Sequence, residues 1–251
     1  MRQVEFDGKG NRIRWTEIPG EGPARVYLHG LGSMSAVYHA HIVARPELTG
    51  RRSLLMDLPG HGTSDRPEHF GYTLEEHADA VAAALDRAAI AGAELTGHSM
   101  GGAVAIVLAH RRPDLVGRLV LAEANLDACP PPTAGSSGIA AHDEEEFVAG
   151  GYARVLEAVG PLWAATMRLA DPRALHRSAA GLRRGSDPVM RTILEGLPIE
   201  RVYLQGEESG ALDGRERLEA AGVRVVTVPG AGHNIMFDNP EAFAAAVAGQ
   251  Y

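Results

Sequence analysis

One short motif, Gly-His-Ser-Met-Gly at residues 97–101, constrains the fold of this chain more than any other feature. It lies between a short apolar run, Ala93 to Thr96, and a run of small residues, Gly101 to His110, that favours a helix. Glycines on both sides of a serine at such a junction indicate a sharp strand-to-helix turn, because a side chain there would collide with neighbouring backbone. The motif therefore predicts that Ser99 is presented as a nucleophile.

Short apolar runs alternate with longer helical patterns along most of the chain. This alternation predicts an α/β fold with a mostly parallel central sheet and helices on both faces. We expect strands at Ile13 to Glu17, Arg25 to Leu28, Ser53 to Asp57, Ala93 to Thr96, Leu119 to Glu123, Arg201 to Gln205 and Arg224 to Val228. We expect helices at Thr73 to Ala89, Gly101 to His110 and Pro240 to Ala248, the last one capped by Asn239.

The alternation stops between residues 127 and 197, where sequence rich in Pro, Ser and Gly gives way to helical segments. We therefore predict a core formed by residues 1–126 and 198–251 and a helical lid formed by residues 127–197. The expected lid helices are near Glu144 to Val159, Leu162 to Leu169, Arg173 to Arg183 and Pro188 to Glu195. The substrate-binding residues predicted from this segment are Phe147, Tyr152 and Trp163, with Met167 and Met190 as further candidates.

Composition and charge narrow the classes of partner. Hydrophobic residues make up 45% of the 251 residues and charged residues 22%, as in an ordinary globular protein. The formal net charge of −8 gives no reason to expect binding to nucleic acid or to an anionic membrane, so a small molecule is the expected partner. The first residues lack the apolar core of a signal peptide and no run is long enough to cross a membrane, so we expect a cytoplasmic protein.

Metal and cofactor chemistry are not expected. Cys129 is the single cysteine, so an internal disulfide and a thiolate metal cluster are both excluded, and we interpret this residue as a bystander. The sequence contains no His-Glu-x-x-His motif either.

Two histidine motifs, one before and one after Ser99, occur where nucleophilic serine chemistry requires them. His233, in Gly232-His233-Asn234, is predicted to be the base that takes the Ser99 proton, because an imidazole can accept that proton and return it to a leaving group. His29-Gly30 ends an upstream apolar run, where a loop could bring a backbone N–H beside the serine. Acidic residues lie between Ser99 and His233, so the chain has a serine, an acid and a histidine in the required order.

These motifs, with Asp-Leu-Pro-Gly-His-Gly-Thr-Ser at residues 57–64, resemble those of the alpha/beta-hydrolase family, and the resemblance covers nearly the whole chain. The residue 57–64 segment is interpreted as a structural turn. The resemblance implies an oxyanion hole formed by the backbone N–H groups of Met100 and Leu31, with Gly32 or Ser33 as alternatives to Leu31.

The motifs leave several candidates for the third catalytic member, an acid. In most of the family the acid follows the next-to-last strand, but here Ser209 occupies that place in Gly-Glu-Glu-Ser at residues 206–209. A minority of the family carries the acid after the preceding strand, where this chain has Glu123. We favour Glu123, and the alternatives are Glu207 or Glu208, then Asp127 or Asp213.

The leading functional hypothesis is a cofactor-independent serine hydrolase that cleaves an ester or lactone through an acyl-enzyme on Ser99. A serine nucleophile also allows hydrolysis of a carbon–carbon bond in a diketone-like substrate, whereas chemistry with an aspartate nucleophile is disfavoured. A second hypothesis is a ligand receptor of the same fold with slow turnover. A purely structural role predicts a broken serine or histidine, and neither is broken.

Overall fold

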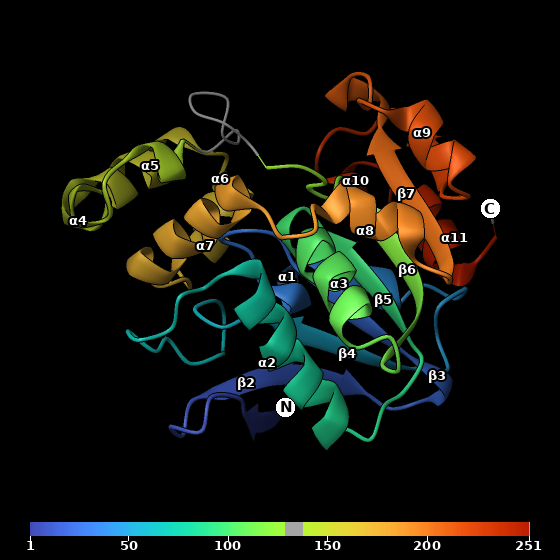
Figure 1. The fold of residues 1–251 in the computed structure, drawn as a ribbon, viewed down its shortest axis with the longest axis horizontal. Helices are drawn as coiled ribbons and strands as arrows, with labels where there is room; N and C mark the ends of the chain where they lie inside the picture. Colours follow the sequence, from blue (N-terminus) through green and yellow to red (C-terminus); the bar gives the residue numbers. More distant parts are fainter. Residues whose placement is uncertain (129–137, 251) are drawn as a thin grey trace.

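The computed structural model describes residues 1–128 and 138–250, so Cys129 lies outside the described part of the chain. Its centre is an eight-stranded sheet with the order β1-β2-β4-β3-β5-β6-β7-β8 (Figure 1). The strands from β3 to β8 are parallel, and β2 pairs antiparallel with both β1 and β4. The predicted α/β fold with a mostly parallel sheet is confirmed.

Seven of the strands correspond to predicted ones, with ends that differ by up to a few residues. The bounds are β1 Arg2–Glu5, β2 Arg12–Ile18, β3 Glu21–Leu28, β4 Arg51–Asp57, β5 Ala93–His98, β6 Val116–Ala122, β7 Glu200–Gly206 and β8 Arg224–Val228. Strand β1 was not predicted. It is a short edge strand with no buried residue, so it leaves no apolar pattern in the sequence.

Helices cover both faces of the sheet. One face packs against α2 (Leu74–Arg87), α3 (Met100–Arg111) and α8 (Met190–Gly196). The other face packs against α1 (Ser35–Val43), α10 (Ile235–Asp238) and α11 (Pro240–Ala248). Helix α9 (Arg215–Ala220) precedes β8, and neither α1, α9 nor α10 was predicted. Within the described residues, no helix has the length and apolarity needed to cross a membrane.

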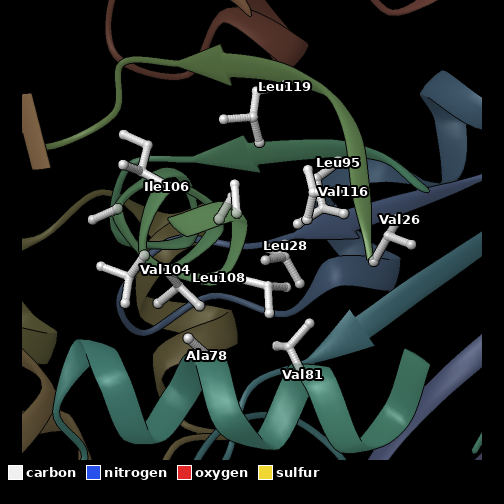
Figure 2. Packing of buried hydrophobic residues seen from close by; sticks show 14 of the residues in the cluster. Val26, Leu28, Ala78, Val81, Leu95, Val104, Ile106, Leu108, Val116 and Leu119 are labelled. Carbon is white, nitrogen blue, oxygen red and sulfur yellow. The ribbon is translucent and has the colours of Figure 1, made fainter. Parts of the chain in front are cut away.

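Helix α3 is made of small apolar residues because it is buried in the core on one face of the sheet. Residues 100–109 of α3 are all buried, because α3 lies between the sheet and the neighbouring helices α2 and α8. Figure 2 shows the side chains that fill this layer, which come from strands (Val26, Leu28, Leu95, Leu119) and from α2 and α3 (Ala78, Val81, Val104, Leu108). A helix that is apolar on all sides is stable only when it is buried in this way.

The segment predicted as the lid contains two kinds of helix. Helices α4 (Glu144–Glu146), α5 (Tyr152–Ala158), α6 (Pro161–Met167) and α7 (Pro172–Arg184) lie together at one end of the molecule (Figure 1). They enclose a small apolar cluster of their own with the 3-10 helix η1 (Ile139–Ala141) and the π-helix η2 (Phe147–Gly151). Helix α8 instead joins the main core through Met190, Ile193 and Leu194.

The lid helices are fixed to the loop that follows β4. Asp171 donates its backbone N–H to the Gly60 carbonyl at 2.9 Å. Arg66 donates to the Leu169 carbonyl at 2.7 Å, and Arg177 donates to the Phe70 carbonyl at 3.1 Å. The loop itself is held by Asp57, whose buried carboxylate accepts backbone N–H groups at 3.0 and 2.9 Å. These helices therefore have a defined position relative to the sheet.

Candidate active site

Ser99 stands on the turn between β5 and α3 in a conformation that few side chains adopt. Its φ is 51° and its ψ is −119°, and its N–H donates to the Ala122 carbonyl at the end of β6. The flanking glycines are required by close backbone approach: a Cβ on Gly97 would lie 2.6 Å from the Gly101 carbonyl oxygen, and one on Gly101 would lie 2.5 Å from the His29 carbonyl oxygen. Non-glycine residues with positive φ cluster at functional sites.

Glu123 occupies the equivalent position at the end of the neighbouring strand β6. It also has a positive φ, of 49°. Its Oε1 accepts the N–H of Gly206 at 2.7 Å, and its Oε2 lies 3.5 Å from Nδ1 of His233. The carboxylate is therefore anchored on β7 and aimed at the imidazole.

His233 lies on the loop between β8 and α10. The loop is held by the Asp238 carboxylate, which accepts the N–H of Gly232 at 3.0 Å. It is also held by His98, whose Nε2–H donates to the His233 carbonyl at 2.9 Å. Burial keeps the pKa of His98 well below its usual value, so His98 is neutral and serves as a structural donor. The His233 side chain is half exposed.

The carboxylates of two of the alternative acids have other partners. Glu207 accepts the N–H of Gly230 at 3.0 Å, and Asp127 pairs with Arg191 at 2.6 Å. Glu208 donates its backbone N–H to Ala231, and Asp213 lines a separate surface hollow beyond β7. Across residues 1–128 and 138–250, the ion pair of His233 is with Glu123 alone. The geometry therefore favours Glu123, to which the sequence pointed because position 209 is a serine and not an aspartate.

The Ser99 hydroxyl contacts a residue that the sequence analysis did not single out. Ser99 Oγ lies 3.5 Å from Oδ1 of Asn125, which follows Glu123 by two residues at the same sheet edge. A hydrogen bond of that length is weak. The position of Asn125 after a central parallel strand is the signal that could have found it.

The loop after β3 lines the same cavity as the serine. His29 fixes it: Nδ1–H donates to the Gly30 carbonyl at 2.7 Å, and Nε2 accepts the N–H of Leu58 at 3.0 Å. These two bonds require a neutral ring, and burial lowers the pKa of His29 to about 4. The Leu31 carbonyl accepts a 2.7 Å hydrogen bond from the indole N–H of Trp163 on α6. Met100, the other predicted oxyanion residue, begins α3 directly after Ser99.

A cavity of about 360 Å³ brings these residues together, which is a volume suited to a small ligand. Its lining comprises Gly30, Leu31, Ser33, Tyr38, His98, Ser99, Asn125, Trp163, Leu182, His233 and Asn234. Tyr38 and Leu182 were not predicted. Their side chains reach the cavity only through the packing of α1 and α7, and no motif marks them.

The three lid residues predicted to bind substrate have different positions. Trp163 lines the cavity. Phe147 is fully buried in the lid cluster, and Tyr152 packs beside it and donates its hydroxyl to the Met167 carbonyl at 3.0 Å. Phe147 and Tyr152 are therefore lid packing residues rather than members of the cavity lining, because the aromatic side chains are needed to fill the small lid core. Met167 and Met190 are likewise fully buried.

No group of three or more His, Cys, Asp or Glu side chains that could hold a metal ion occurs in the described part of the chain.

Comparisons with known proteins identify the family and the fold. A family model described as the alpha/beta hydrolase fold matches residues 24–180. The 2-(acetamidomethylene)succinate hydrolase of Mesorhizobium japonicum is 29% identical over 245 residues, which cover 88% of this chain and 85% of that protein. An esterase of Mycobacterium tuberculosis is 33% identical over 183 residues, covering 71% of this chain but only 55% of its own length.

Among solved structures, an esterase from Exiguobacterium antarcticum superposes with a TM-score of 0.81 at 21% identity, over 99% of this chain and 98% of that one. At that level of identity the likeness concerns the fold alone.

Proposed function

The chain belongs to the alpha/beta-hydrolase family, and from this premise we propose that it is a cofactor-independent serine hydrolase that cleaves an ester or a lactone of a small organic molecule. The observation that carries the proposal is that Ser99 and His233 line one cavity and that the carboxylate of Glu123 pairs with His233. A relative that is named as an esterase supports the assignment of this chain to the hydrolases.

The first half-reaction forms an acyl-enzyme. The Ser99 hydroxyl turns from Asn125 towards His233, which takes its proton as Oγ attacks the substrate carbonyl carbon. The bond to the leaving oxygen then breaks, and His233 returns the proton to the departing alcohol. In a lactone that alcohol stays attached to the acyl chain.

The second half-reaction releases the acid. His233 takes a proton from a water molecule, whose oxygen attacks the acyl carbon, and Ser99 leaves with the proton that the imidazole gives back. Glu123 holds the Nδ1–H tautomer throughout and stabilises the imidazolium that forms in each step.

The developing oxyanion needs fixed donors. The N–H of Met100 at the start of α3 and the N–H of Leu31 are proposed for this role. Because the Leu31 carbonyl is held by Trp163, the peptide groups of that loop are oriented before substrate binds. Loss of one such donor typically raises the barrier by about 2.7–4 kcal/mol.

Chromogenic esters test the proposal. We expect p-nitrophenyl acetate or butyrate to be hydrolysed with multiple turnovers, and Ser99→Ala to reduce kcat/KM at least about 10³-fold. Ser209→Ala is the matched control, because this serine is exposed and lies outside the cavity, and it should match the wild type.

Two results would contradict the proposal. Undiminished turnover by Ser99→Ala would place the chemistry elsewhere. Stoichiometric binding of esters and lactones with negligible turnover would instead support a receptor.

A further inference from the structure

The side chains that line the cavity carry no permanent charge. Apart from Ser99 and the two histidines, its polar and aromatic side chains are those of Ser33, Tyr38, Asn125, Trp163 and Asn234, and all are neutral. No Lys, Arg, Asp or Glu belongs to the lining formed by the described residues. Residues 129–137, Cys-Pro-Pro-Pro-Thr-Ala-Gly-Ser-Ser, which lie outside the described part of the chain, contain no charged residue.

Two arginines, on helices α7 and α8, are occupied elsewhere. Arg183 follows the lining residue Leu182 on α7, and its guanidinium donates to the Ala140 carbonyl within the lid. Arg191 at the start of α8 pairs with Asp127 at 2.6 Å. Neither guanidinium is therefore directed at a ligand in the cavity.

Carboxylates, in contrast, surround the loop that carries His233. Glu123 faces the imidazole, and the carboxylates of Glu207 and Asp238 accept the N–H groups of Gly230 and Gly232. Glu208 Oε2 lies 3.9 Å from the place that a Cβ on Gly232 would occupy. Like charges nearby disfavour a second anion, and this side of the site is rich in them.

Resting on the proposed function, we propose that this cavity selects uncharged acyl groups and rejects substrates that carry a carboxylate. Burying a carboxylate without a cationic partner is costly, whereas an uncharged chain can pack against Trp163 and Leu182 at no such cost. The same feature assists turnover, because hydrolysis of a neutral ester leaves a carboxylate product that nothing in the cavity retains.

A pair of esters that differ in one charge tests this inference. In p-nitrophenyl methyl adipate the far carboxyl group is a neutral methyl ester, whereas in mono-p-nitrophenyl adipate it is an anion. After correction for the rate of each ester with hydroxide, we expect kcat/KM to be about 100-fold higher for the neutral ester. A ratio within about threefold of unity, or a preference for the anion, would overturn the proposal.

A binding measurement separates this inference from the proposed function. With Ser99→Ala, calorimetry or competition should show that dimethyl adipate binds at least about tenfold more tightly than monomethyl adipate. If neither chromogenic ester is turned over by the wild type, the proposed function fails, while this comparison still decides the question of charge. Equal affinities would overturn the inference.

A designed cation provides the complementary test. Leu182 lines the cavity and is partly exposed, so a longer polar side chain can be accommodated there. Leu182→Arg should raise the ratio of kcat/KM for the anionic ester to kcat/KM for the neutral ester about tenfold over its wild-type value. Leu182→Gln, which has similar polarity but no charge, is the control and should not rescue the anionic ester. Equal effects of the two variants would contradict the charge argument.

Discussion

At the scale of single residues, the identity of the acid depends on which carboxylate can reach the Nδ1 edge of His233. The sequence directs attention to Glu123 because Ser209 replaces the acid usual at that place, and the structure puts the Glu123 carboxylate 3.5 Å from Nδ1. Its other oxygen is anchored by the N–H of Gly206. Its catalytic role stays a prediction.

A pair of substitutions tests that role. Glu123→Gln keeps the carbonyl oxygen that accepts from Gly206 but cannot stabilise the imidazolium, so we expect kcat/KM to fall by about 10³–10⁴-fold with little change in melting temperature. Glu208→Gln should remain within about twofold of the wild type, since the Glu208 carboxylate is not paired with His233 in the described structure. The reverse pattern in steady-state kinetics would assign the acid to Glu208.

The residues that sequence reasoning missed share one property. Tyr38, Asn125 and Leu182 reach the cavity because of how α1, β6 and α7 pack, and none lies in a motif. The reverse holds for Phe147 and Tyr152, whose aromatic character suggested a pocket although the lid needs them for its own core. Local sequence predicts the motif turn at Ser99 well, because its glycines act through neighbouring backbone, but it cannot predict side chains that meet through tertiary packing.

At the scale of elements, strongly patterned segments were predictable and weakly patterned ones were not. Helix α11 occurs at Pro240–Ala248 as predicted, with Asn239 Oδ1 accepting the N–H of Ala242 as its cap. Strand β1 and helix α9 bury at most one residue each, so they leave little periodic signal. The helices between residues 144 and 196 occur close to where they were predicted, whereas the packing of α8 against α3 is shown by no local pattern.

The contact between lid and oxyanion loop supplies a prediction at this scale. Trp163→Phe keeps an aromatic ring in the cavity but removes the 2.7 Å hydrogen bond to the Leu31 carbonyl. The lost hydrogen bond contributes a net free energy of about 1 kcal/mol to the orientation of the loop. We therefore expect kcat/KM to fall about fivefold to tenfold, mainly through kcat. Leu162→Phe, an exposed position on the same helix, is the control and should leave kcat unchanged. An unchanged kcat in Trp163→Phe would show that the bond does not position the loop.

At the scale of the whole molecule, the fold buries several neutral histidines. His29, His39, His61, His77 and His98 are almost completely inaccessible to solvent. Burial is the largest cause that lowers their pKa values, to about 4 for His29 and about 3 for His39 and His61. The pKa values of His77 and His98 are also well below the usual 6.5.

These shifts make stability depend on pH with a definite sign. Below about pH 6.5 the unfolded chain binds protons that the folded chain excludes, so the free energy of unfolding decreases as pH falls from 6.5 towards 4. We expect it to be at least about 3 kcal/mol lower at pH 5 than at pH 7, as measured by urea unfolding.

Two histidine variants check the origin of this dependence. His39→Leu removes one buried ring and should make the pH dependence shallower, whereas His110→Leu, at an exposed position, should leave it unchanged. Equal unfolding free energies of the wild-type protein at pH 5 and pH 7 would contradict this account.

The central claim is that Ser99 becomes covalently acylated with the help of His233 and Glu123, and intact-mass spectrometry after treatment with a fluorophosphonate tests it most directly. The account predicts one adduct per chain, located on the peptide that contains Ser99, absent from Ser99→Ala and formed far more slowly in Glu123→Gln. A native protein that forms no adduct, or an adduct that persists in Ser99→Ala, would contradict it.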